Sequence, residues 1–145
     1  MSATTSAAGS WNDQVIAQFR AGDLRIADMF DRSALVLLHT IGAKSGEPRT
    51  SPLAYFDLDG QLIIVASAAG RDTHPAWYFN LLAHPQVSVE RWHQGAIESL
   101  SVLATVAEGD ERERLWARIS ATAPGFAEYQ KKTDRVIPVI VLNRV

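Results

Sequence analysis

Two cations and two hydroxyl groups lie together in one glycine-flanked segment of the chain. Lys44 and Arg49 are five residues apart in the stretch GAKSGEPRT, with Ser45 and Thr50 beside them. Glycines let backbone N–H groups approach an anion closely, and both cations form charge-assisted hydrogen bonds to phosphate oxygens. The spacing matches neither the Walker loop nor the GxGxxG motif. The segment indicates a phosphate-type anion site, and a polar hairpin with its cations in solvent beside Glu47 is the alternative.

A run of small residues forms a second candidate site. The stretch ASAAG, residues 66–70, follows the apolar run LIIV directly. Small residues at a strand end leave room for a flat ring against the backbone. Trp77 or Tyr78 could pack beside such a ring, and Asn80 could form a hydrogen bond with a polar group on it. The alternative is that these aromatic side chains form only the core face of a helix, and spacing does not decide between the two.

The residue types and their spacing do not indicate a metal site or a catalytic nucleophile. The chain has no cysteine, which excludes disulfides, thiolate catalysis and Cys-ligated metals. His39, His74, His84 and His93 show no metal-site spacing, so no metal is expected. We expect His39 inside a strand, and His74 and His84 at helix ends, as caps or in solvent. Ser67 lacks the GxSxG context of a hydrolase nucleophile.

The elements that must position these residues are short strands and hairpins. Apolar runs, β-branched residues and turn signals predict about six antiparallel strands, at residues 34–40, 49–57, 62–67, 87–90, 97–106 and 136–141. The Asp59-Gly60 turn predicts that the second and third strands pair. Helices are predicted at residues 12–20, 75–84 and 110–123. Pro138 predicts an edge or bulge position for the last strand.

Size and charge limit the class of protein. The chain has 145 residues, 47% hydrophobic and 21% charged, with a net charge of −2, which predicts one domain over residues 11–145 and no nucleic-acid partner. Residues 1–10 are small and polar, and we expect a disordered leader rather than a signal peptide. No apolar run reaches bilayer-spanning length, so we expect a cytoplasmic protein. The fold class is mostly β with peripheral helices, a barrel or sheet rather than a doubly wound nucleotide-binding fold.

Four stretches carry a resemblance to a known family. GAKSGEPRTSPL, VASAAG, HPAWYFNLLAHPQVSVE and EYQKKTDRVIPVIVL occur in the order and spacing of the deazaflavin-dependent nitroreductases, the F420-dependent reductases of actinobacteria. The resemblance extends from about Val15 to the C-terminus. It implies a split β-barrel, also used by FMN-binding oxidases, and hydride transfer from reduced coenzyme F420 to a conjugated acceptor such as a quinone, an enone or a nitro compound.

The resemblance also implies roles for individual residues. Lys44, Ser45 and Arg49 would hold the phosphate and acidic tail of F420, with the deazaflavin ring along residues 66–70. The complete set expected at the coenzyme is Lys44, Ser45, Gly46, Arg49, Thr50, Pro52, Ala66, Ser67, Ala68, Ala69, Gly70, Trp77 and Asn80. Tyr129 and Tyr78 are the expected proton donors, with solvent as the alternative.

Two other functions are compatible with these residues. One is an FMN-dependent oxidoreductase of the same split-barrel fold, and the other is a non-catalytic protein that binds a deazaflavin or an apolar ligand. The expected partner is a small-molecule hydride acceptor. A homodimer and peripheral contact with a membrane are left open.

Overall fold

The structure is a computed structural model that describes residues 7–28 and 30–145. The helices are α1 (Ala7–Ala21), α2 (Ala76–Ala83), α3 (Gly109–Thr122) and α4 (Pro124–Lys131). The strands are β1 (Arg25–Ile26), β2 (Phe30–Asp31), β3 (Leu35–Ile41), β4 (Pro48–Ala54), β5 (Phe56–Leu58), β6 (Gln61–Val65), β7 (Gln86–His93), β8 (Ala96–Val106) and β9 (Val139–Arg144). Two short 3₁₀ turns, Arg32–Ala34 and Ala68–Gly70, complete the described elements.

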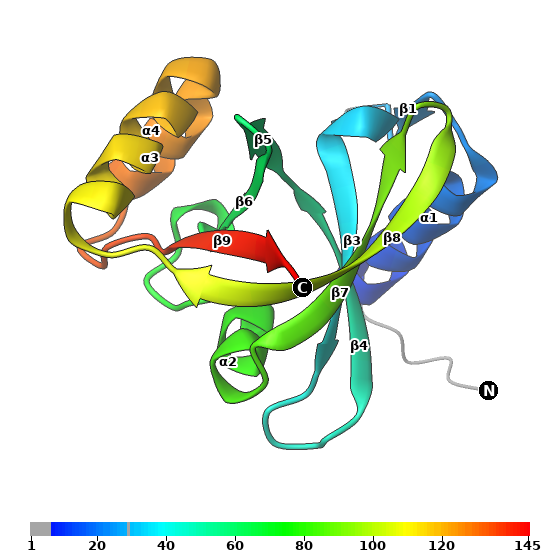
Figure 1. Cartoon of the computed structure of the whole chain (residues 1–145), viewed down its shortest axis with the longest axis horizontal. Helices are drawn as coiled ribbons and strands as arrows, with labels where there is room; N and C mark the ends of the chain where they lie inside the picture. Colours follow the sequence, from blue (N-terminus) through cyan, green and yellow to red (C-terminus); the bar gives the residue numbers. More distant parts are fainter. Residues whose placement is uncertain (1–6, 29) are drawn as a thin grey trace.

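Seven strands form one antiparallel sheet in the order β4-β3-β7-β8-β9-β6-β5. The sheet curls into a half-barrel, with α1 on one side of it and the α3–α4 pair on the other (Figure 1). β1 and β2 form a small separate hairpin. The predicted fold, a split β-barrel with peripheral helices, is confirmed, with seven strands in the main sheet where about six were expected.

β3, β6 and β9 carry continuous buried runs because both faces of the sheet are covered along them. Along β6, Leu62 and Ile64 belong to the interior cluster, which Trp77 of α2 completes. Their neighbours Ile63 and Val65 belong to a second cluster, shared with α3 and α4. A third cluster lies between α1 and the outer face of β3. α2 is therefore fixed by the interior cluster, and β6 by packed clusters on both of its faces.

The strand predicted over residues 49–57 is two strands. The ladder of β4 ends at Ala54, and β5 begins at Phe56 and pairs with β6. At the break, Tyr55 N–H donates to the carbonyl of Ala34 at 3.1 Å. The predicted hairpin at Asp59-Gly60 is confirmed, but only its β5 part pairs with β6, because β4 pairs with β3. The chain thus crosses at Tyr55 from one edge of the curled sheet to the other.

The last strand is not at an edge, which corrects the prediction from Pro138. β9 lies between β8 and β6. Pro138 precedes the strand and accepts a hydrogen bond from Ala66 N–H at 3.0 Å through its carbonyl. A proline at this point removes no ladder hydrogen bond, so a central strand tolerates it.

The start of the first helix and the presence of a fourth helix also differ from the predictions. α1 begins at Ala7, so residues 7–10 are helical and do not belong to a disordered leader, while residues 1–6 lie outside the described residues. α4 was not predicted as a helix, although Pro124 stands at its first turn, where proline fits well. Tyr129, one of the expected proton donors, lies on this helix.

Candidate functional site

The hairpin between β3 and β4 is a tight turn that depends on two glycines. Gly42 N–H donates to the carbonyl of Glu47 at 2.8 Å, and Gly46 N–H donates to the carbonyl of Gly42 at 2.9 Å. Gly46 has φ +70°, a conformation that side chains disfavour. A Cβ on Gly42 would overlap the hydroxyl of Ser45. The glycines therefore shape the turn that carries the two cations.

The cations of this hairpin form only weak contacts within the protein. Arg49 lies 3.5 Å from the hydroxyl of Ser45 and 3.6 Å from the carboxylate of Glu47, both at or beyond the limit of a good hydrogen bond. Such exposed ion pairs contribute about 0–1 kcal/mol. Lys44 is exposed and has no hydrogen bond to another described residue. Both cations are therefore available to an anion from outside.

Asn80 of α2 connects this hairpin to the core through two hydrogen bonds. Its Oδ1 accepts a hydrogen bond from Ala43 N–H at 2.9 Å, and its Nδ2 donates to the hydroxyl of Thr40 at 3.2 Å. The side chain is buried, with 8% of its residue surface exposed. Asn80 also lines the hollow beside the hairpin, and its amide positions the backbone next to Lys44.

A cavity of about 520 Å³ opens between the hairpin, α2 and the start of α1. We call it the cationic cleft. Its walls include Lys44, Ser45, Arg49, Thr50, Trp77 and Asn80, with Asn12 and Phe79. The residues that the sequence grouped as an anion site thus line one hollow.

The segment after β6 has an unusual backbone. Ala68, Ala69 and Gly70 have φ values of 47°, 55° and 81°, all in the left-handed region. For a residue with a side chain this region costs roughly 1–2 kcal/mol. Two local hydrogen bonds, Gly70 N–H to Ser67 O at 2.9 Å and Arg71 N–H to Ala68 O at 3.1 Å, close the turn. Such a conformation persists only when its surroundings hold it in place.

The guanidinium of Arg135 holds this segment. Its Nη2 donates to the carbonyl of Ser67 at 2.7 Å, its Nη1 to that of Ala66 at 3.1 Å, and its Nε to that of Arg71 at 2.8 Å. Nη1 also lies 3.0 Å from Nδ1 of His74. Sequence reasoning missed Arg135, and the only signal for it was its place in the TDR end of one resembling stretch.

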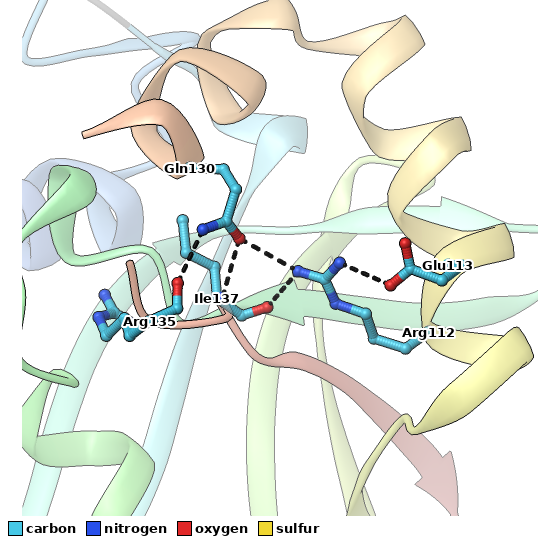
Figure 2. A network of polar contacts seen from close by, with 5 residues as sticks. All are labelled: Arg112, Glu113, Gln130, Arg135 and Ile137. Carbon is cyan, nitrogen blue, oxygen red and sulfur yellow. Dashed lines mark hydrogen bonds and ion pairs between the residues drawn. The ribbon is translucent and has the colours of Figure 1, made fainter. Parts of the chain in front are cut away.

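The loop that carries Arg135 is held in turn by α3 and α4 (Figure 2). Gln130 donates to the carbonyl of Arg135 at 2.7 Å and accepts from Ile137 N–H at 3.0 Å. Arg112, buried on α3, donates to the carbonyl of Ile137 at 2.7 Å. The helix pair therefore fixes the loop whose arginine shapes the segment at residues 66–71.

Gly70 gives a stability prediction. A Cβ there would lie 2.8 Å from the carbonyl oxygen of Tyr129, in addition to the cost of φ +81°. Gly60 has a similar φ, +87°, but open space around it, so it is the matched control. We expect Gly60→Ala to lower the free energy of unfolding by about 1 kcal/mol and Gly70→Ala by about 3 kcal/mol. Urea denaturation measures both, and equal losses would contradict the close contact with α4.

A second hollow of about 720 Å³ lies beside this segment. We call it the apolar groove. Its walls include Trp11, Phe30, Leu35, Pro52, Leu53, Val65, Ser67, Ala68, Ala69, His74, Trp77, Phe126 and Tyr129. Asn12, Ala76 and Trp77 line both hollows. The cationic cleft and the apolar groove therefore meet at Trp77.

The structure brings most of the expected site residues to these hollows. Four expected residues do not line either one. Gly46 shapes the hairpin, Ala66 is buried, and Gly70 packs against α4. Tyr78 lies beside His74, with 4.5 Å between the ring centroids and the ring planes tilted by 40°. His74, which was expected to cap a helix or face solvent, instead lines the apolar groove.

His39 lies inside β3, as expected, with both ring nitrogens engaged. Its partners are the hydroxyl of Thr50 and the carboxylate of Glu90, which also pairs with Arg20 of α1. Across residues 7–28 and 30–145, no group of three or more His, Asp or Glu side chains could hold a metal ion. None of the helices in that part of the chain has the length and apolar character to cross a membrane.

The fold is that of the split-barrel proteins, and in this chain a cationic cleft and an apolar groove share Trp77 in their walls. The chain belongs to the F420H(2)-dependent quinone reductase family, which matches residues 11–144. An F420H(2)-dependent quinone reductase of Mycobacterium tuberculosis strain H37Rv is 37% identical over 112 residues, 75% of this chain and 72% of the relative. The predicted membership of the F420-dependent reductases is thereby confirmed.

Two solved structures are similar to this chain. One, described as an F420-H2 dependent reductase, is 42% identical, with a TM-score of 0.65 over 76% of this chain and 94% of its own. Another, described as a domain-swapped dimer, is 37% identical, with a TM-score of 0.68 over 95% of this chain and all of its own. The predicted enzyme class and coenzyme F420 are confirmed by this family, which gives no support to the FMN alternative.

Proposed function

We propose that this protein transfers a hydride from reduced F420 to a quinone at the junction of the two hollows. The observation that carries the proposal is the meeting of a cationic cleft and an apolar groove at Trp77 in a chain of this family. A coenzyme with an anionic tail and a flat ring needs both environments. A quinone, planar and largely apolar, needs the second.

The coenzyme tail would bind at the hairpin. Lys44 and Arg49 would bond its phosphate and acidic groups, with the hydroxyls of Ser45 and Thr50 as further donors. The two cations line the cleft with little internal pairing, which fits an anion of this kind. Asn80 would hold the turn in the binding geometry through its bond to Ala43 N–H.

The ring would lie along the backbone of residues 67–69, the part of the predicted stretch 66–70 that lines the apolar groove. The small side chains there let a flat ring approach the strand end closely, and Pro52 and Trp77 would bound it. The left-handed turn that Arg135 holds sets the shape of this surface. When bound in its reduced form, F420 supplies the hydride. The protein's part is to hold the acceptor against the ring. Such positioning can lower the activation free energy by up to about 7–11 kcal/mol.

Reduction of a quinone to a hydroquinone also needs a proton besides the hydride. We propose Tyr129 as its source in preference to Tyr78, because Tyr129 lines the apolar groove and Tyr78 lines neither hollow. Water that enters the groove is the alternative donor.

The variant Tyr129→Phe tests the proton donor. It keeps the ring that packs on Phe126 and removes only the hydroxyl. We expect kcat to fall about tenfold, since positioned proton transfer contributes about 10²–10⁴-fold and solvent replaces part of it. Steady-state rates measured beside Tyr78→Phe, the matched control, give the comparison. An unchanged kcat with every quinone would reassign the proton to solvent.

One experiment separates the proposed function from its alternatives. Purified protein is mixed with reduced F420 or with reduced FMN and then given a quinone or a cyclic enone. Oxidation of F420 alone, with the quinone as acceptor, supports the proposal. Oxidation of FMN would support the flavin alternative, and tight binding of F420 without turnover would support a binding protein.

We also propose that the protein forms a homodimer and functions in the cytoplasm. The 37% identical structure described as a domain-swapped dimer supports self-association. The molar mass of the purified protein in solution tests it. Peripheral contact with a membrane and the absence of a nucleic-acid partner also remain predictions.

A further inference from the structure

His74 lines the apolar groove, and the proposed binding and proton-transfer roles leave it without a function. It directly precedes Pro75 and the start of α2 and is half-buried. Its ring lies 4.5 Å from that of Tyr78 and 5.8 Å from that of Phe79, both on α2. These aromatic contacts hold the imidazole in a defined place in the groove wall.

One ring nitrogen of His74 has a fixed partner. Nδ1 lies 3.0 Å from Nη1 of Arg135, and a guanidinium can only donate hydrogen bonds. Nδ1 must therefore accept, and in the neutral ring the hydrogen is on Nε2. Arg135 is itself bound to three backbone carbonyls, so it cannot turn away. Within the described residues, Nε2 has no hydrogen-bond partner in the protein.

The surroundings of His74 keep its ring neutral. Burial lowers the pKa of His74, and the positive charge of Arg135 lowers it further. The other ionisable groups nearby are Arg71 and Tyr129, which line the groove, and Tyr78, whose ring lies beside the imidazole. Burial lowers the pKa of Arg135, and the negative charge of Asp72 opposes this effect. No carboxylate among the described residues forms a hydrogen bond or an ion pair with the imidazole. At neutral pH, the ring is therefore a neutral donor through Nε2.

We propose that Nε2–H of His74 donates a hydrogen bond to a carbonyl oxygen of the quinone and stabilises the negative charge that develops there during hydride transfer. This inference rests on the proposed function. The quinone gains two electrons and one proton as hydride, and a second proton from Tyr129 or water completes the hydroquinone. His74 keeps its own proton throughout. A preorganised donor in an apolar site is the arrangement that stabilises a developing oxyanion.

One substitution separates this role from support of Arg135. In His74→Asn, the amide oxygen can replace Nδ1 as the acceptor for Arg135, but no donor reaches the position of Nε2. We expect His74→Asn to lower kcat/KM for a quinone about tenfold, with the dissociation constant of F420 within twofold of wild type. His84→Asn, at the other, exposed end of α2, is the matched control and should keep wild-type kcat/KM.

The pH profile gives a readout that a structural role would not move. In wild type, kcat/KM should fall on the acid side of neutrality, below the ordinary imidazole pKa of about 6.5, because a protonated ring faces the guanidinium of Arg135 and disturbs this geometry. In His74→Asn, this acid limb should disappear. Wild-type kcat/KM with the acid limb intact in His74→Asn would overturn the proposal.

A measurement without turnover separates this proposal from the proposed function. Nitrogen-15 NMR of the folded protein with oxidised F420 should show His74 with the hydrogen on Nε2 and none on Nδ1, and adding a quinone should shift the Nε2 signal. A hydrogen on Nδ1, or no shift on saturation with the quinone, would overturn the inference. Failure of wild type to oxidise reduced F420 with any quinone would overturn the proposed function instead.

Discussion

The double variant Lys44→Ala/Arg49→Ala should bind F420 about 100-fold more weakly than wild type. Each charge-assisted hydrogen bond contributes about 1.5–3 kcal/mol, and both cations are exposed, so the lower end applies. About 1.4 kcal/mol is a factor of ten, and two such losses give a factor of about 100 if they add. Folding should not change, because Arg49 has only weak contacts and Lys44 has none among the described residues.

Titration of F420 fluorescence and urea denaturation measure the two effects. The matched control is Arg114→Ala/Lys131→Ala, which removes the same charge from the exposed faces of α3 and α4. If net charge alone attracted the coenzyme, both double variants would lose affinity equally. A folded Lys44→Ala/Arg49→Ala variant with wild-type affinity would contradict the tail site. The affinity of wild type should also fall with added salt, since the cations are exposed.

The parts of this fold that could be predicted are those with local causes. The run at residues 62–65 predicts a strand because β6 is buried on both faces, and the Asp59-Gly60 turn predicts its hairpin because the turn chemistry is local. The cations of the β3–β4 hairpin could likewise be grouped, since they are close in sequence and the turn between them is short. In each case, the pattern that carries the prediction lies within a short stretch of the chain, although the burial of β6 itself depends on α3, α4 and β9.

The parts that failed depend on distant residues. The break at Tyr55 arises because β4 and β5 pair with strands at opposite edges of the sheet, and no turn residue marks it. The edge position predicted for β9 from Pro138 was wrong because β9 begins one residue after this proline. His74 could not be placed in the groove from its spacing, since its partner Arg135 lies 61 residues further along the chain. Sequence reasoning grouped the residues that line the cationic cleft, but it missed Arg135 and the place of His74 in the apolar groove.

Removing the guanidinium of Arg135 should have the largest combined effect on stability and activity. In Arg135→Gln, the carbonyls of Ala66, Ser67 and Arg71 lose a charged donor, and His74 loses the partner of its Nδ1. Hydrogen bonds to charged groups contribute about 1.5–3 kcal/mol each, but Arg135 is partly exposed and water replaces part of this. We expect the free energy of unfolding to fall by about 3 kcal/mol.

Activity should fall more than stability alone explains. Without Arg135, the left-handed turn at Ala68, Ala69 and Gly70 can relax, because its two local hydrogen bonds do not offset the backbone cost. A displacement of about 1 Å in a positioning surface can cost about 100-fold in rate. We expect kcat/KM of Arg135→Gln for a quinone to fall about 100-fold at a temperature where the variant remains folded.

Arg135→Lys distinguishes geometry from charge. The lysine keeps the positive charge, but a single ammonium cannot present the planar fork that reaches three carbonyls and an imidazole at once. Its kcat/KM should therefore stay closer to that of Arg135→Gln than to wild type, while Arg114→Ala, an exposed control on α3, should match wild type. Hydrogen exchange should speed up at Gly70 and Arg71, whose amides close the turn. Full activity in Arg135→Lys would mean that charge near the groove, and not the shape of the turn, is what the enzyme requires from this residue.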